Sequence, residues 1–313
     1  MKAPPKWMVL LGLAVLLAGI SLAQERFRGG GRRGGRDGGG WRGGGDSTGP
    51  IVYTEGGDAV NEDTVRTARE TASHSEGTPN WTNDPEFEDD VFTFARVIYK
   101  FDRSAPSRMA WVNDYPDSDL NLSFRLQQLT SMKVNPDGRV LKLTNPDLFD
   151  YPFIYMVKAG RMELRDEEVP ILRKYLASGG ALMADDFWGD YDWIHFENQI
   201  QRVLPKNHWV ELPMSHDIFQ RPFLLKGEKN NLQVPSINRW ERSGVSYRGE
   251  DTHDVHVRAW LDDKERIMVI ATHNTDNGDG WEREGENIEY FKTYSEPRAY
   301  PLGINIIYYL MTH

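Results

Sequence analysis

Apolar residues fall into short runs, separated by segments in which they recur every three or four positions. The runs are rich in β-branched and aromatic residues, as buried strands are, and they occupy residues 91–100, 139–143, 153–157, 181–184 and 208–212. Helical spacing occurs at residues 117–131, 164–180 and 193–204. The pattern therefore predicts strands and helices in alternation.

Two later runs flank Asp262, Asp263 and Lys264, which predicts a hairpin of strands 255–261 and 266–272 joined by a tight turn. Residues 302–311 at the end of the chain show helical spacing again. Because strands and helices alternate through the middle of the chain, we expect an α/β fold with a mostly parallel sheet and helices on both faces.

The first ninety residues lack this alternation. Residues 1–23 combine two lysines with an uncharged run of 16 apolar residues and end in Ser-Leu-Ala, which predicts a signal peptide cleaved after Ala23. An uncleaved anchor is the alternative, although about 20 residues are needed to span a bilayer. Residues 24–50 predict a disordered Gly/Arg-rich linker, residues 51–90 a polar extension that wraps the surface or stays partly loose, and residues 91–313 the folded domain.

The net charge limits the kinds of partner that the protein can bind, and the absence of cysteine limits its chemistry. Residues 1–46 hold eight Lys and Arg against three Asp and Glu; since the whole chain has a net charge of −10, the remainder carries −15. An acidic body binds nucleic acid poorly, so no nucleic-acid partner is expected. The linker arginines are compatible with an anionic envelope polymer. The chain has no cysteine, which excludes disulfides and thiolate chemistry.

The run 181–184 stops at Asp185 and Asp186, where a strand is expected to pass into a loop. Ligands of open α/β sheets bind at the carboxyl ends of strands, so the two acids are candidate site residues. The alternative is structural, because aspartates also end strands and cap helices. For Asp192 the cap of a helix starting near Trp193 is the favoured interpretation.

Four segments in this order carry a family resemblance: "DYPDSDLNLSFRL", "NPDLFDYPFIYMV", "LRKYLASGGALMADDFWG" and "NTDNGDGWE". Over roughly residues 92–312 the chain resembles a bacterial domain of unknown function, number 4159. The resemblance implies a flavodoxin-like three-layer sandwich of the class I glutamine amidotransferase-like superfamily, with no assigned biochemical role.

Active amidotransferases of that fold carry a nucleophilic cysteine after a central strand, and a histidine and a glutamate after a late strand. Here Asp185 and Asp186 stand where the cysteine is expected, His273 ends the late strand, and Thr275 stands where the glutamate would be. Glutamine hydrolysis through a thioester is therefore excluded.

Other side chains are weaker candidates for the same edge of the sheet. His216 follows another predicted strand and joins Asp185, Asp186 and His273 as a candidate catalytic residue. The glycine-rich loop after the late strand supplies second-rank candidates for ligand binding, namely Asp276, Asp279 and Glu282. The aspartate pair together with His216 or His273 is compatible with a divalent cation, but the spacing matches no metal motif, so neither a metal site nor a cofactor is predicted.

The leading hypothesis is an exported protein, periplasmic or secreted, that binds an envelope ligand or protein partner without the ancestral chemistry. On this hypothesis the protein is not an enzyme. The alternative is a carbohydrate- or envelope-directed hydrolase that uses Asp185 or Asp186 with a histidine. Both hypotheses use one cleft at the strand ends.

Overall fold

The computed structural model describes residues 50–87, 90–101 and 111–313. The predicted signal peptide 1–23 and all but the last residue of the predicted linker 24–50 lie outside these residues. Residues 47–313 form one structural unit, to which the description below applies. In the described ranges, no helix is both long enough and apolar enough to cross a membrane.

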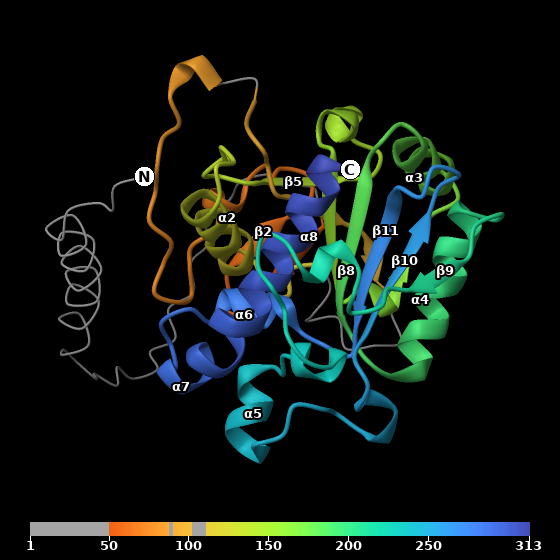
Figure 1. Cartoon of the computed structure of the whole chain (residues 1–313). Helices are drawn as coiled ribbons and strands as arrows, with labels where there is room; N and C mark the ends of the chain where they lie inside the picture. The colour runs from red at the N-terminus through yellow and green to blue at the C-terminus, as the bar shows by residue number, and fades with distance from the viewer. Residues whose placement is uncertain (1–49, 88–89, 102–110) are drawn as a thin grey trace, which may run out of the picture. The chain divides into compact units, whose positions relative to one another are not determined.

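The centre of this unit is a seven-stranded sheet with the order β5-β3-β6-β8-β11-β10-β9. The first five strands in that order are parallel, and β10 is antiparallel to both β11 and β9 (Figure 1). The bounds are β3 Ala95–Ile98, β5 Arg139–Lys142, β6 Phe153–Val157, β8 Ala181–Phe187, β9 Trp209–Glu211, β10 His256–Leu261 and β11 Ile267–His273. The predicted α/β class, with a mostly parallel sheet, is confirmed.

Two smaller sheets have two strands each. They pair β1 with β2 and β4 with β7, and their bounds are β1 Ile51–Tyr53, β2 Ala59–Asn61, β4 Lys100–Phe101 and β7 Met162–Glu163. The predicted hairpin is also present, because β10 and β11 pair antiparallel around the turn at Asp262.

Helices cover both faces of the large sheet. One hydrophobic cluster joins α3 and α4 to inward residues of β6, β8 and β11, and a second joins α2, α6 and α8 to the other face. Successive side chains of a strand point to opposite faces, so fully apolar strands supply both clusters. The helices are α2 Asp117–Leu129, α3 Glu168–Ala177, α4 Gly189–Val203, α5 Ile237–Ser243, α6 Asn277–Glu282, α7 Ile288–Tyr290 and α8 Tyr300–Thr312, with a π-helical segment Phe291–Ala299 before α8.

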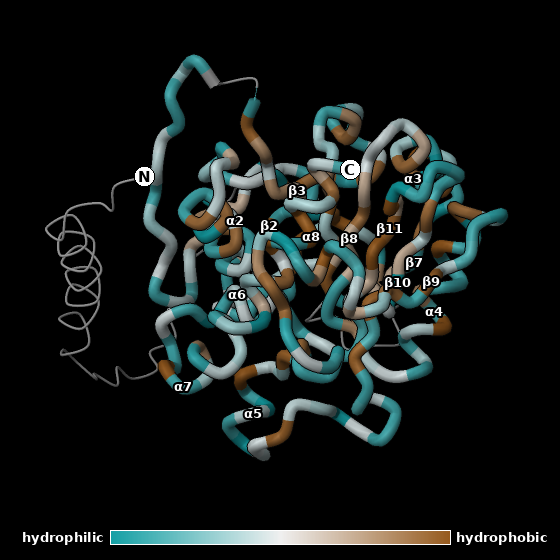
Figure 2. Tube along the Cα trace, viewed as in Figure 1, coloured by the Kyte–Doolittle hydropathy of each residue, from teal (hydrophilic) through white to brown (hydrophobic). Residues whose placement is uncertain are grey.

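Hydropathy follows this layering. Figure 2 shows hydrophobic colour along the central strands and hydrophilic colour on the outer loops. The helix predicted from the spacing at 164–180 is α3, and Gly179 beyond its end has a φ of 110°, the positive φ expected of a glycine there.

Two local predictions at the end of β8 are wrong. The strand does not stop before the acids, because Asp185, Asp186 and Phe187 belong to β8. Helix α4 begins at Gly189, four residues earlier than expected, so Asp192 lies in its first turn and does not cap it. The Asp192 carboxylate instead binds Arg161, with a distance of 2.6 Å between Nε and Oδ1.

The polar extension before residue 91 is bound to the domain by side chains. Trp81 Nε1 donates to the carbonyl of Val134 at 2.8 Å, and Arg69 Nε donates to the carbonyl of Pro136 at 3.0 Å. The described residues of the extension therefore lie along the surface of the domain, which is the first of the two predicted arrangements.

Candidate functional site

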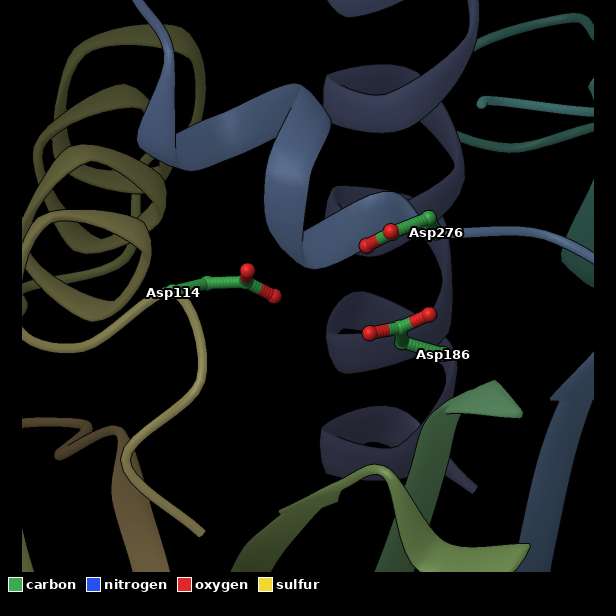
Figure 3. Close-up of side chains that lie close together, drawn as sticks. All are labelled: Asp114, Asp186 and Asp276. Atoms are coloured by element: carbon green, nitrogen blue, oxygen red, sulfur yellow. The ribbon is translucent and has the colours of Figure 1, made fainter. Parts of the chain in front are cut away.

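Acidic side chains gather at the carboxyl ends of the parallel strands. Asp186 is the penultimate residue of β8, Asp276 follows β11, and Asp114 lies shortly before α2. Each can offer a carboxylate oxygen, and these three oxygens lie within 4.8 Å of one another. We call Asp114, Asp186 and Asp276 the strand-end triad, whose carboxylates face a common space in Figure 3.

Asp186 is turned into this space by its backbone. Its φ of 53° is left-handed, which only a few per cent of residues other than glycine adopt. Its Oδ2 accepts from Asn113 Nδ2 at 3.0 Å and pairs with Lys158, the residue directly after β6. Its Oδ1 accepts from Trp188 Nε1 at 2.8 Å and from Arg248 at 3.2 Å. Asp186 thus has four donors around two oxygens.

Asp114 is the least satisfied member of the triad. Its φ of 58° is also left-handed, and its side chain is 1% exposed. Oδ1 accepts from Asn113 Nδ2 at 2.6 Å, but Oδ2 is buried with no hydrogen-bond donor among the described residues. A Cβ on Gly278 would lie 2.2 Å from Oδ2, so only glycine at 278 leaves room for this oxygen.

Asp276 links the triad to α6. Its Oδ1 caps the helix by accepting from the backbone N–H of Asp279 at 3.1 Å. Its Oδ2 lies 3.4 Å from the guanidinium of Arg248, which also contacts Asp186. Arg248 therefore joins two acids of the strand-end triad from its outer side, where its own side chain is 33% exposed.

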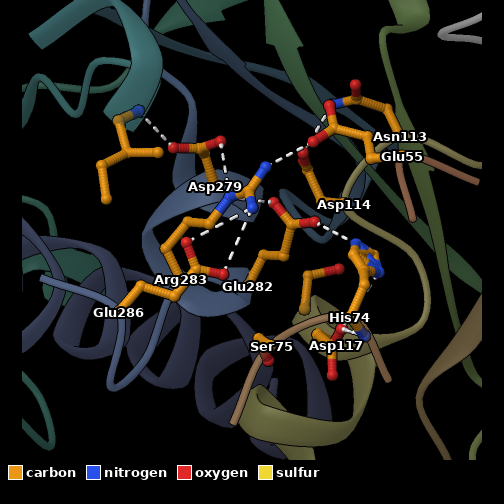
Figure 4. A network of polar contacts seen from close by, with 12 residues as sticks. Glu55, His74, Ser75, Asn113, Asp114, Asp117, Asp279, Glu282, Arg283 and Glu286 are labelled. Atoms are coloured by element: carbon orange, nitrogen blue, oxygen red, sulfur yellow. Dashed lines mark hydrogen bonds and ion pairs between the residues drawn. The ribbon is translucent and has the colours of Figure 1, made fainter. Parts of the chain in front are cut away.

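A second group of acids shares Asp114. Carboxylate oxygens of Asp114, Asp279 and Glu282 also lie within 4.8 Å of one another, and we call these residues the helix triad because two of them belong to α6. Figure 4 shows the contacts around this group. Asp279 Oδ2 accepts from the N–H of Ile237 at 2.6 Å and from Tyr290 at 3.2 Å.

Glu282 meets a histidine of the N-terminal extension. Its Oε1 lies 2.7 Å from His74 Nε2, and its Oε2 lies 2.8 Å from Arg283 Nε (Figure 4). His74 also approaches Asp117 at 3.3 Å, and Arg283 pairs with Glu55 of the same extension. The extension thus closes one side of the helix triad.

Asp185 differs from its neighbour. Its Oδ1 accepts from Thr272 at 2.5 Å and from Asn277 at 2.8 Å, and its Oδ2 accepts from the N–H of Gly278 at 3.0 Å. Burial raises the pKa of Asp185 to about 6, although these bonds favour the ionised form. The satisfied carboxylate fastens β8 to β11 and to the start of α6.

Taken together, the buried acids of this region carry more negative charge than the neighbouring cationic side chains can balance. Six carboxyl groups are buried here, namely Asp114, Asp185, Asp186, Asp276, Asp279 and Glu282. Three cationic side chains contact them, those of Lys158, Arg248 and Arg283. If all were ionised, three negative charges would be left unbalanced in a buried space, which is costly.

The pKa values of these buried acids are raised, in agreement with the excess of negative charge. Burial, and then the charges of Asp276 and Glu282, raise the pKa of Asp114 well above its usual range. Burial also raises the pKa of Glu282 well above its usual range and that of Asp279 to about 6. The centre must therefore hold protons or bound cations. Clustered carboxylate oxygens are the ligands that hard cations such as Mg²⁺, Ca²⁺ and Mn²⁺ prefer.

The candidate histidines do not join this centre. His273 Nε2 donates to the carbonyl of Gly189 at 3.0 Å, its ring stacks on Phe187, and burial lowers its pKa to about 3. His216 Nδ1 accepts from the N–H of Ile218, and its ring packs on Tyr309. Within the described part of the chain, neither histidine bonds to Asp185 or Asp186.

The structure brings Asp186 together with Asp276 in one triad and Asp279 together with Glu282 in the other, and Asp114 links the two triads. Sequence analysis did not select Asp114, Lys158, Arg248 or His74. The sequence held a signal for Lys158, which directly follows a predicted strand beside the one that carries Asp186. Asp114 and Arg248 lie in loops whose sequence gives no such signal.

The residues that form both triads, from Asp114 to Glu282, fall within one family match. The match covers residues 93–311, and the family is described as a domain of unknown function (DUF4159). The chain belongs to the DUF4159 family. No curated protein matches the chain. His74 lies outside the DUF4159 match, so the extension adds a side chain to a centre that the family domain otherwise supplies.

Proposed function

We propose that this protein is an exported binding protein, periplasmic or secreted, whose ligand centre holds a hard divalent cation in the helix triad. The observation that carries the proposal is the Oδ2 atom of Asp114. It is buried, has no donor, and is faced by four other carboxyl groups. A cation with oxygen ligands would satisfy this atom.

The helix triad suits a cation better than the strand-end triad because its oxygens are less occupied. From the described residues, Asp279 Oδ1 receives no hydrogen bond, and its closest cationic atom is Arg283 Nε at 3.8 Å. Each Glu282 oxygen has one neighbouring nitrogen and therefore retains a lone pair. The four acceptor positions of Asp186, by contrast, are all in use.

We further propose that the domain is a flavodoxin-like member of the amidotransferase-like superfamily that has lost the ancestral chemistry. Support comes from the parallel strands, whose chain order across the sheet is 2-1-3-4-5, the order of flavodoxin-like folds. The partner would be an envelope ligand or protein, and the Gly/Arg-rich linker would add contacts to an anionic envelope polymer.

The alternative hydrolase has less support. Its acid would be Asp185 or Asp186, but Asp185 is saturated by four donors, and His216 and His273 bond elsewhere. A hydrolase would need another proton-transfer partner. Binding is therefore the function that the geometry supports best.

Melting curves of metal-free protein with added Ca²⁺, Mg²⁺ or Mn²⁺ test the proposal. At a cation concentration 100 times Kd, we expect a gain of about 2.7 kcal/mol in the free energy of unfolding. Glu282→Gln should abolish the gain. Glu168→Gln, a change at a buried carboxyl of α3 outside the centre, should retain it. A folded wild-type protein that responds to none of the three ions would refute the proposal.

A further inference from the structure

A cationic side chain of the protein, Arg248, lies against the strand-end triad. Arg248 lies between Asp186 and Asp276, 3.2 Å from the first carboxylate and 3.4 Å from the second. The third carboxylate, that of Asp114, forms no ion pair with the described residues and has a buried Oδ2 without a donor, and Asp114 belongs to both triads. Figure 3 shows the three carboxylates converging from three different elements.

We propose that the strand-end triad binds a second hard divalent cation in place of Arg248, and that Asp114 bridges the two ions. The inference rests on the proposed function, because the first ion in the helix triad supplies the other half of the bridge. Carboxylate-rich sites of this kind commonly hold two ions about 3.5–4 Å apart.

The side chain of Arg248 is held weakly enough for a cation to displace it. Its contacts with the acids are longer than those of the other donors to Asp186, and its guanidinium is 33% exposed. It stacks on the indole of Trp188 at 4.4 Å, on the outer side of the centre. The backbone of Arg248 is held separately, since its N–H donates to Thr252 Oγ1. The side chain can therefore move while the loop stays in place.

Lys158 behaves differently. It pairs closely with Asp186 Oδ2 and is only 16% exposed. Although burial lowers its pKa, the charge of Asp186 raises that pKa above the usual range, so the side chain remains a fixed cation. Release of Arg248 frees Asp186 Oδ1 and Asp276 Oδ2 for a metal and leaves the bonds that orient Asp186 intact.

Two side-chain amides turn their nitrogens towards the acids. Asn113 Nδ2 donates to both Asp114 and Asp186, and Asn277 Nδ2 donates to Asp185. These amides orient the carboxylates of the centre.

Charge balance agrees with two ions. With Arg248 away, the six buried carboxylates face only Lys158 and Arg283, which leaves four unbalanced negative charges. Two divalent cations supply four positive charges. The full exchange therefore converts an acid-rich interior into a neutral one.

Titration of the metal-free full chain with Mn²⁺, followed by calorimetry and electron paramagnetic resonance, tests the inference. We expect two ions per chain in the wild type, with a signal from coupled spins because the ions share a carboxylate. Asp276→Asn should bind one uncoupled ion. Arg248→Gln should tighten the second ion about tenfold, because a competitor that occupies the site most of the time is removed.

The matched control is Arg161→Gln. Arg161 also pairs with an aspartate and stacks on an aromatic ring, at 4.4 Å from Tyr191, but it is outside the centre and should leave both affinities unchanged. Binding of one ion by the wild type would overturn the second site while leaving the proposed function in place. Binding of none would refute both. Two ions with no tightening in Arg248→Gln would overturn the exchange with Arg248.

Discussion

Two buried charged groups lie a few residues apart in the chain and are built on opposite principles. Arg96 of β3 and Asp119 of α2 form a closed pair, in which the guanidinium also donates to Ser118 and to the carbonyls of Trp111 and Asn113. Asp114 has one donor for two oxygens and four acidic neighbours. The first group has matched charge and saturated donors; the second has neither.

This difference separates structural from functional burial. A buried pair with every donor used gains little from any added molecule, and it fixes α2 against β3. A buried group with a free acceptor and excess charge is costly until a proton or a cation arrives. The chain tolerates that cost at one place, the carboxyl ends of its parallel strands, where such folds bind ligands.

The largest expected effect comes from breaking the balanced pair. Arg96→Met leaves Asp119 buried and unpaired, so the free energy of unfolding should fall by about 3–5 kcal/mol. Urea denaturation measures it. A loss below about 1 kcal/mol would mean that the pair of Arg96 and Asp119 does not have the structural role proposed for it.

An effect that is smaller for each pH unit is expected from a third buried polar group, His273. His273 is satisfied while neutral, with a pKa lowered to about 3, whereas in the unfolded chain it titrates near 6.5. Between these values only the unfolded state takes up the proton. Stability should therefore fall as pH drops from about 6.5 towards 3, by up to about 1.4 kcal/mol per pH unit.

His273→Phe keeps the stacking on Phe187 and removes the proton, so its stability should depend less on pH in this window than that of the wild type. The difference between two series of urea denaturation curves, one for each protein, isolates this contribution from other groups. Parallel pH profiles would show that His273 is charged in the folded protein.

The smallest effect has the opposite sign. In metal-free buffer at neutral pH, Asp114→Asn should raise the free energy of unfolding by about 1 kcal/mol, because it removes a carboxyl group whose ionisation is opposed by burial and by four acidic neighbours, and because asparagine adopts a left-handed φ readily. The same variant should no longer be stabilised by Mn²⁺. Asp119→Asn is the control and should destabilise. If both Asp114→Asn and Asp119→Asn destabilise the protein, Asp114 is a structural group like Asp119 and the proposed difference between them is wrong.

The fold could be predicted further than the site. Apolar runs gave the positions of β5, β6 and β8 because strands buried on both faces must be apolar throughout. The end of β8 was missed for a physical reason: Asp185 is polar but pairs with Val157 in the ladder, and Asp186 lies at a register shift between β8 and β11. Thr272 of β11 satisfies the first carboxylate, and Lys158 pairs with the second.

The site was predictable where a residue ends a strand and not where it lies in a loop. Asp276 follows β11 and was selected, whereas Asp114 is positioned by a left-handed turn ahead of α2. Its role depends on Gly278, more than 160 residues away, which leaves space for its oxygen. Such a contact is fixed by tertiary packing, which no local pattern encodes.

The contacts of the extension impose an order on assembly. His74 meets Glu282 across 208 residues of sequence, and Glu55 meets Arg283 across 228. Closing loops of that length costs entropy before any contact repays it, so these bonds should form after the strands have paired. During synthesis the extension emerges well before its partners, Glu282 at the end of α6 and Arg283 directly after it. The extension therefore closes its side of the helix triad only after α6 has been made.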